Sequence, residues 1–441
     1  MRLSLTLTAL LMLSTSSFQA LCAQQAWSLD DCVKYALENN IQVQQAQNTV
    51  ESAEADVKQA RAALFPSLTF GSSQSLSFQK TETQSYSTID SQIKNPTYSG
   101  SYQLSASMTL FDGGSNWHTL QKNKLTLEAD QLSAQKTANQ IEVQIIQAYY
   151  QILYAHESVS VDEVIVDVAQ QELDRTKSKL DVGKATKVDV AQMESQYQQN
   201  VYQLVTARNQ EASNILSLKK LLQLDPAADF AIDYQNYSDE EILALIPSLA
   251  DAEQMALENL PDMRAAELQT KAAELQTKVA KAGYMPSLSL NAGISTGNGN
   301  TYAGGFISQL EDHMRENVGV SLSVPILDNR RTRTSVDKAK IQYANALLNQ
   351  EDTRLQLQNT IASLHLDTQS AQSRYKSAEA KEASAKESFD MMNERYGVGL
   401  ESVIDLLTSK NEYLQACQET LQSKYTALMD LSLLRFYTGQ K

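Results

Sequence analysis

The sequence is poor in cysteine, and the few that it has are far apart. It contains three cysteines in 441 residues. Cys22 lies in a predicted leader, while Cys32 and Cys417 are 385 positions apart, which is not the spacing of a disulfide framework. We expect these two to be free thiols. A single bond between them, formed in an oxidising compartment, is the alternative.

Long hydrophobic runs are also missing. No stretch has 18 consecutive apolar residues, so the sequence predicts no transmembrane helix, and any membrane-spanning part would consist of strands. The apolar run at residues 3–13 follows Arg2 and is too short to span a bilayer. We therefore predict a secretory signal peptide over residues 1–23. Lipidation of Cys22 is the less favoured alternative, because Leu21 stands where a lipid-attachment motif has a small residue.

Positive charge is scarce. Acidic residues outnumber basic ones by 52 to 37, and loss of Arg2 with the leader takes the net charge from −15 to −16. Because such a chain repels the phosphate backbone, we expect no nucleic-acid partner.

Motifs for bond chemistry are absent as well. The sequence has no H-E-x-x-H, no G-x-S-x-G and no phosphate-binding loop. Its histidines have no metal-ligand spacing; they are His118, His156, His313 and His365. We therefore predict a protein that is not an enzyme, with no catalytic residues, no cofactor and no metal.

What the sequence does contain is an internal duplication. Ser28-Leu29 returns as Ser248-Leu249, and Pro66-Ser67-Leu68 returns as Pro286-Ser287-Leu288, both 220 positions later. Later matches are 216 positions apart, and these pairs are Asp112 with Asp328, Gly183 with Gly399, Asp189 with Asp405 and Tyr197 with Tyr413. A repeat of this kind decides the fold. We predict a first repeat over residues 24–225, a linker over 226–246 and a second repeat over 247–441.

Each repeat contains a long helical hairpin. Residues 115–181 and 330–396 have helical composition, and as single helices each would be roughly 100 Å long. Each is followed by a glycine-containing break, as a helix end requires, and then by a returning helix. Leucines at 407, 414, 421 and 428 have the seven-residue spacing of coiled-coil packing. The fold class is therefore mainly α.

Four segments alternate apolar and small polar residues with the period of a strand. They are residues 66–79, 101–110, 287–295 and 317–326. Each is about ten residues long, which suits a tilted strand of an outer-membrane barrel. On that interpretation five apolar side chains face lipid, namely Leu104, Met108, Leu290, Val320 and Leu322. The alternative is a soluble sheet whose apolar face packs on helices. The loops 80–97 and 297–315 are polar and are expected to be external.

Four strands cannot close a barrel, because open edges in hydrocarbon leave backbone groups unpaired. Closure needs at least about eight strands. From the residues alone, two or three chains would suffice.

The ordered set of motifs resembles the TolC family of outer-membrane efflux proteins. The resemblance lies in the hairpin tips at 180–190 and 396–407, in Leu110-Phe111-Asp112-Gly113-Gly114, and in the two Pro-Ser-Leu strand starts. It covers nearly the whole chain after the leader. Two positions depart from the pattern: Asn329-Arg330 replaces the second Gly-Gly, and Thr109 stands where the other copy has Pro325.

The resemblance implies a homotrimer with a twelve-stranded barrel in outer-membrane lipid and a twelve-helix periplasmic tunnel. Its tips would meet a periplasmic adaptor protein, and an inner-membrane pump would supply energy. It also implies an acidic constriction near the narrow end, which we assign to Asp390. Arg175, Lys179 and Arg395 nearby are candidates for ion pairs between subunits. The candidate adaptor contacts are Gly183, Asp189, Gly397, Gly399 and Asp405.

We therefore predict a passive outer-membrane exit duct for efflux or secretion that extends into the periplasm. The rival interpretation is a periplasmic coiled-coil scaffold with a small soluble sheet. Extraction of the protein from cells distinguishes the two interpretations, because a scaffold would be recovered in the soluble fraction.

Overall fold

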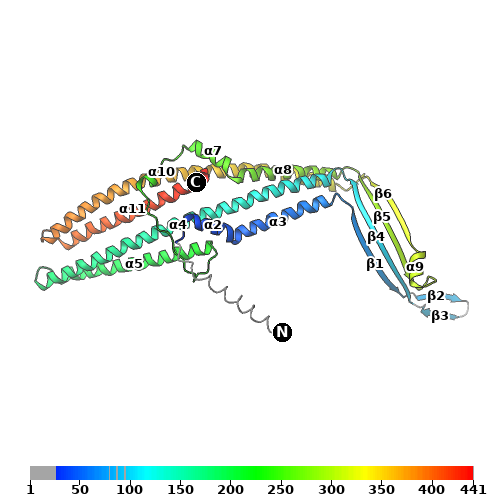
Figure 1. The fold of residues 1–441 in the computed structure, drawn as a ribbon, viewed down its shortest axis with the longest axis horizontal. Coiled ribbons are helices and arrows are strands. Elements are labelled where there is room, and N and C mark those ends of the chain that lie inside the picture. Colours follow the sequence, from blue (N-terminus) through cyan, green and yellow to red (C-terminus); the bar gives the residue numbers. More distant parts are fainter. Residues whose placement is uncertain (1–25, 79, 86–87, 94–95, 441) are drawn as a thin grey trace, which may run out of the picture. The chain divides into compact units, whose positions relative to one another are not determined.

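The computed structural model describes residues 26–78, 80–85, 88–93 and 96–440 (Figure 1). The predicted signal peptide and Cys22 lie outside the described residues. The chain forms two compact units. Of the described residues, the helical unit contains 26–47, 134–261 and 354–440, and the sheet unit contains those within 48–133 and 262–353.

The helices repeat in order and in length along the chain. The first series is α2 (Leu29–Asn39), α3 (Ile41–Ala62), α4 (Ser115–Asp181) and α5 (Lys187–Leu221). The second series is α7 (Leu249–Asn259), α8 (Pro261–Ala282), α10 (Arg331–Gly397) and α11 (Val403–Thr438). The paired lengths are 11 and 11, 22 and 22, 67 and 67, and 35 and 36 residues. The predicted long helices are confirmed to within one residue at each end.

Side-chain caps explain where four of these helices begin. Ser28, Thr186, Ser248 and Ser402 each accept a hydrogen bond from the backbone N–H three residues later. In every case that third residue is an aspartate, whose charge favours the positive end of the helix dipole. The short helix α6 (Asp239–Ile242) lies between the two series.

The core of the helical unit is apolar and draws on both series. It contains Ile145 and Tyr149 of α4, Leu218 of α5, Tyr375 of α10 and Leu428 of α11, all buried. Figure 1 shows α4 with α5, and α10 with α11, as two hairpins. Among the described residues no helix is both long and apolar enough to cross a membrane.

The cysteine prediction is confirmed for the two described thiols. Cys32 is buried in this core, Cys417 is partly buried, and neither forms a disulfide. Burial raises the pKa of Cys32 to about 12 and that of Cys417 to about 11, so both stay protonated.

The sheet unit carries four antiparallel strands in the order β1-β4-β5-β6. Their bounds are β1 (Ser67–Ser77), β4 (Thr97–Phe111), β5 (Ser287–Gly299) and β6 (Arg315–Ser323). Their register gathers the apolar positions into rows across the sheet, since opposed residues share a face. One row is Leu68–Ala106–Ala292–Val318, and the next is Met108–Leu290–Val320. The predicted alternation is confirmed.

The apolar face of the sheet remains exposed in the monomer. Phe70 is 67% exposed and Val318 is 78% exposed, and Leu104, Val320 and Leu322 are also exposed. Leu288, Met108 and Leu290 are half-buried. The alternative of a soluble sheet covered by the chain's own helices predicts buried side chains here, and the structure does not have them.

Two details of the predicted strands and loops are wrong. The fourth strand ends at Ser323 and not at 326, because Pro325 has no N–H to donate to the ladder. The register of β4 with β5 also shifts between Thr109 and Phe111, so that Phe111 lies opposite Leu288. The predicted loop 80–97 contains a hairpin, β2 (Lys80–Ser85) with β3 (Thr88–Ile93), and the loop 297–315 contains helix α9 (Phe306–Asp312).

Candidate functional site

The face of the sheet opposite to the apolar rows is small and polar. Ser67, Ser107 and Asn291 form one row across the sheet. The hydroxyls of Ser67 and Ser107 lie 2.9 Å apart, within hydrogen-bond distance. Such a surface offers hydrogen bonds to water without charge, as the lining of an aqueous channel does.

A left-handed turn joins the sheet to a long helix in each repeat. In the first, Gly113 and Gly114 have φ of 70° and 83°. In the second, Asn329 and Arg330 adopt the same region, with φ of 53° and 65°. The preceding aspartates cap both helices, since Asp112 accepts from the backbone N–H of Asn116 at 2.8 Å, and Asp328 accepts from that of Thr332 at 2.7 Å. The departure from Gly-Gly therefore changes residue type without changing the turn.

The hairpin tips are built on glycine. Gly183 and Gly399 have φ of 74° and 82°, and both are exposed with open space around them. Gly397 is the last residue of α10 and is also exposed, but its φ is not positive. The side chains of Val182 and Val398, beside these turns, are also exposed, at 68% and 73%. Each tip thus presents bare backbone and an apolar side chain.

Asp189 and Asp405 lie just past the tips, where they hold the start of the returning helix. Asp189 accepts hydrogen bonds from the backbone N–H of Thr186 at 2.7 Å and from its hydroxyl at 2.9 Å. Asp405 accepts from the hydroxyl of Ser402 at 2.6 Å. Both carboxylates are therefore engaged in capping the helix at the tip.

The predicted gate residue, Asp390, is a solvent-exposed carboxylate on the last two turns of α10. Its counterpart in the first repeat, Asp174, is also exposed and accepts a hydrogen bond from Gln170 at 3.1 Å. Of the three basic candidates nearby, Arg395 pairs with Glu401 of its own chain at 2.6 Å.

Sequence analysis missed a set of charged contacts that tie α4 to α11. Lys410 is 2% exposed, and its Nζ lies 2.6 Å from a carboxylate oxygen of Glu172. Lys424 contacts Glu157 at 3.1 Å, and the Tyr425 hydroxyl donates to the same carboxylate at 2.5 Å. The sequence does contain a sign that both lysines are buried. Each lies three residues after a leucine of the 407–428 heptad series, and that spacing marks a core position of a coiled coil.

A further contact joins α4 to α10 near the tips. The Lys179 ammonium lies 3.9 Å from the centre of the Tyr396 ring and donates to the Tyr396 carbonyl at 3.4 Å. Burial, with repulsion from Arg175 and Lys184, lowers the pKa of Lys179 below its usual value. Tyr396 itself packs with Leu173, Met193, Val403 and Leu406.

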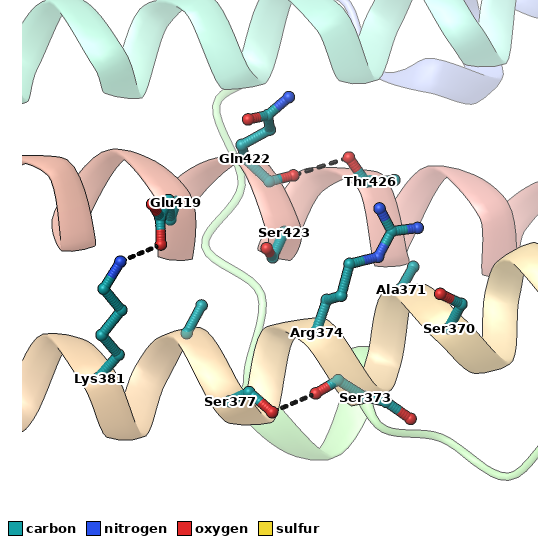
Figure 2. A pocket seen from close by; sticks show the side chains of 11 residues that line it. Ser370, Ala371, Ser373, Arg374, Ser377, Lys381, Glu419, Gln422, Ser423 and Thr426 are labelled. Carbon is teal, nitrogen blue, oxygen red and sulfur yellow. Dashed lines mark hydrogen bonds and ion pairs between the residues drawn. The ribbon is translucent and has the colours of Figure 1, made fainter.

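Figure 2 shows a polar groove between α10 and α11. Its volume is 540 Å³, and four serines and one threonine contribute hydroxyls to its lining. Arg374 extends across it from α10 toward α11, and Lys381 pairs with Glu419 at 2.7 Å at one side. No group of three potential metal ligands occurs within the part of the chain that the structure describes.

Comparison with known proteins places these features in a family. The model of the outer membrane efflux protein family matches residues 32–223 and 252–440. The chain belongs to this family. It is 25% identical over 432 residues to the outer membrane protein TolC of Escherichia coli strain K12, covering 96% of this chain and 84% of that protein.

Two further relatives agree. The alkaline protease secretion protein AprF of Pseudomonas aeruginosa is 21% identical over 435 residues, covering 96% of this chain and 87% of that protein. A crystal structure of CusC has the same fold, with a TM-score of 0.81, 19% identity and 96% of each chain covered. The predicted TolC-family resemblance is confirmed.

As a member of the outer membrane efflux protein family, this protein is an outer-membrane exit duct for efflux and secretion, and it extends into the periplasm. The predicted class and location are therefore confirmed. The mainly helical fold with a four-stranded antiparallel sheet is confirmed as well.

Proposed function

We propose that the protein works as a homotrimer whose three sheets close into a twelve-stranded barrel in outer-membrane lipid, with a twelve-helix tunnel in the periplasm. It is a passive conduit, with no enzymatic activity, cofactor or metal. A periplasmic adaptor docks on its tips, and an inner-membrane pump provides the energy. Its chain consists of two repeats, at residues 24–225 and 247–441, joined by a linker at 226–246.

The observation that supports assembly is a four-stranded sheet with two open edges and an exposed apolar face. β1 and β6 form the edges of the sheet, and each pairs with a neighbour on one side only. In hydrocarbon, unpaired backbone groups cost several kcal/mol each, so edges must be shared between copies.

The strand directions suit such sharing. All three pairings within the sheet are antiparallel, so β1 and β6 at the two edges run in opposite directions. The β6 edge of one copy therefore meets the β1 edge of the next as another antiparallel pair. A ring of any number of copies continues the alternation, and three copies give twelve strands.

The test is the mass of the protein in detergent together with a cross-link between the edges. Light scattering of the full chain should give three chains per particle. In a second experiment, each chain carries Thr69→Cys and Ser321→Cys at exposed positions of the two edge strands. Disulfide cross-linking should then give a denaturing-gel ladder whose largest species contains three chains. The position Ser107→Cys on central strand β4 serves as the control and should not cross-link. A monomer in detergent, or a ladder that ends at two, would overturn the proposal.

Asp390 is proposed as the gate residue because it is exposed near the narrow end, where threefold symmetry repeats it as a ring of carboxylates. Single-channel recordings in planar bilayers test this. Asp390→Asn should lower the preference for cations, while Asp174→Asn, its counterpart, should leave it unchanged. If both variants lowered the preference for cations equally, Asp390 would not be the gate residue.

The adaptor is proposed to grip the exposed tips around Gly183, Gly397 and Gly399, with Asp189 and Asp405 holding the geometry. A photo-reactive residue in place of Val398 tests this contact, because its side chain is exposed beside both glycines of the second tip. It should cross-link to the adaptor in cells. The same residue in place of Val164, exposed on the shaft of α4, is the control. Cross-linking at the control position alone would reject tip docking.

A further inference from the structure

The apolar surface of the sheet has a definite end on the side away from α3, α4, α8 and α10. From Leu288 to Ile294 the strand advances about 20 Å, at about 3.4 Å per residue, which is most of the roughly 25 Å of an outer-membrane apolar band. The last apolar row is Phe70–Leu104–Ile294, and β6 contributes Glu316 to that row. No other row of the apolar face carries a charge.

Beyond that row the same face becomes polar and is hydrogen-bonded. Gln74 donates to the Tyr102 hydroxyl at 2.9 Å and accepts from the Tyr98 hydroxyl. Gly100 makes room for this cluster, because a Cβ there would lie 2.3 Å from Asn298 Oδ1 and 2.6 Å from Gln74 Oε1. Gln74, which interrupts the strand pattern in the sequence, is thus the centre of a paired tyrosine cluster. Tyrosine in this position is typical of a membrane–water boundary.

Helix α9 is fastened to this polar end of the face. The Thr296 hydroxyl donates to the carbonyl of Leu310, and the Phe306 ring packs edge-on against Tyr102 with 6.3 Å between centres. Gln309 is 7% exposed; it accepts from the backbone N–H of Gly299 at 2.9 Å and donates to two carbonyls of its own loop. The helix is therefore held in one orientation on the sheet.

That orientation leaves Ile307 on one flank of α9 and Ser308 on the side opposite Phe306. Helical geometry sets Ile307 about 100° from Phe306 around the axis, with the exposed Glu311 about 40° beyond it and Ser308 and Asp312 farther round. Ile307 is 70% exposed, and Phe306 and Met314 are exposed as well. Met314 directly precedes β6 and is separated from the apolar rows by Glu316. Ser308 donates to Asp312 at 3.2 Å on the polar flank.

We propose that α9 is an interfacial anchor, which lies at the headgroup level of the outer leaflet with Ile307 and Met314 in the acyl-chain region and Ser308 and Asp312 in water. The occupant of this flank is lipid, because α9 packs on Tyr102 and Thr296, the row directly next to the last apolar row of the sheet, and Ile307 is exposed there. The inference rests on the proposed barrel. It assigns a membrane-binding role to a loop that would otherwise be an external connection.

Depth-dependent quenching tests the anchor. A single cysteine is placed at Ile307 or Ser308 in a Cys417→Ser background, where Cys32 is fully buried. Each carries an environment-sensitive fluorophore, and the full chain is reconstituted into phosphatidylcholine vesicles brominated near the headgroup or near the bilayer centre. The label at Ile307 should be quenched by shallow bromines more than by deep ones, since an interfacial helix buries its apolar face by about 5–10 Å. The label at Ser308 should keep its emission.

A third label, at Val320, separates this inference from the barrel itself. Val320 belongs to a middle row of the apolar face, Met108–Leu290–Val320, so in the barrel its label is quenched most by deep bromines. Quenching at Val320 without quenching at Ile307 would overturn the anchor alone, and so would equal quenching at Ile307 and Ser308. Loss of quenching at Val320 would overturn both. As a second measurement, Gly100→Ala displaces Gln74 and Asn298 beneath α9 and should reduce shallow quenching at Ile307 while leaving Val320 unchanged.

Discussion

The helical unit and the sheet unit place their large apolar side chains in opposite surroundings. Ile145, Leu218 and Leu428 of the helical unit are buried within the chain. Phe70 and Val318 of the sheet unit are more than half exposed, and they stand in registered rows. A protein that leaves its most regular apolar surface uncovered needs another molecule to cover it, and in the proposed barrel that molecule is lipid.

Charge follows the same division. β1, β4 and β5 contain no charged residue, and β6 contains only Arg315 and Glu316 at its start. The helical unit instead pairs charges between helices and buries one pair, Lys410 with Glu172. Charged side chains at the surface of the helical unit are inexpensive in water, and the near absence of charge from the strands is what the proposed barrel requires where it would meet hydrocarbon.

The largest loss of stability is expected when one member of the buried ion pair is removed. Glu172→Ala leaves the Lys410 ammonium buried without its partner and should cost about 3–5 kcal/mol. The fall in thermal stability, followed by circular dichroism of the detergent-solubilised protein, measures it. Glu163→Ala is the matched control, because it removes the exposed Arg208–Glu163 pair at 2.6 Å and should cost only about 0–1 kcal/mol. Similar losses from both would show that Lys410 is not buried in the assembly.

The next largest loss of stability is expected from a charge placed on the apolar face of a strand, compared with the same charge on its polar face. Val320→Arg places a charge on the apolar face in one of its middle rows and should cost about 2–4 kcal/mol near the bilayer centre. Ser321→Arg, one residue later, places the same charge on the opposite face and should be tolerated. The yield of folded protein extracted from membranes measures both. Equal damage at the two positions would contradict the assignment of the faces.

Within the helical unit, the caps at the tips test how much local structure contributes. Ser402→Ala removes the hydroxyl that accepts from the Asp405 backbone N–H at 3.3 Å and should cost about 1 kcal/mol. Thr186→Ala should do the same in the first hairpin. Ser384→Ala, at an exposed mid-helix position of α10, is the control and should be neutral or slightly stabilising. Chemical denaturation of the variants provides the comparison, and a cost at Ser384 equal to that at Ser402 would contradict the capping role.

The smallest change in stability is expected from substitutions in the two strand-to-helix turns. Arg330→Gly relieves a left-handed residue and should stabilise the protein by about 0.5–1 kcal/mol. Gly113→Ala, in the other copy, should destabilise it, since a Cβ there would lie 2.6 Å from Met285 Cβ and 2.9 Å from the Ala282 carbonyl. Thermal unfolding of the paired variants shows the sign of each change. Destabilisation by Arg330→Gly would mean that the arginine side chain stabilises the turn.

Much of the fold is predictable because its signals are local. The ends of α4 and α10 follow from glycine turns and from aspartate caps, and the strands follow from alternation with period two. The ends of β6 were mispredicted and the bulge at Leu110 was not foreseen, because both depend on which partner strand supplies hydrogen bonds. Helix α9 was missed since seven residues are too few for a helical period to stand out in a polar loop.

The candidate residues divide in the same way. The turn and cap positions of Gly183, Gly399, Asp189 and Asp405 could be predicted, because a turn and a cap each need particular residues within a short span. Lys410 and Lys424 were not found, although both occupy heptad core positions. Their partners Glu172 and Glu157 lie more than two hundred residues away along the chain, so no spacing rule connects them.

The duplicated order of helices and strands, the two faces of each strand and the chemistry of the hairpin tips can be read from the amino-acid sequence, because each depends on residues within one or two turns of one another. Three features emerge only in the folded chain: the apolar face of the sheet stays uncovered, a lysine is buried between two hairpins, and Gln74 closes the apolar rows beneath α9. Those outcomes depend on register between segments far apart in the chain, and register is settled by packing and hydrogen bonding rather than by local pattern.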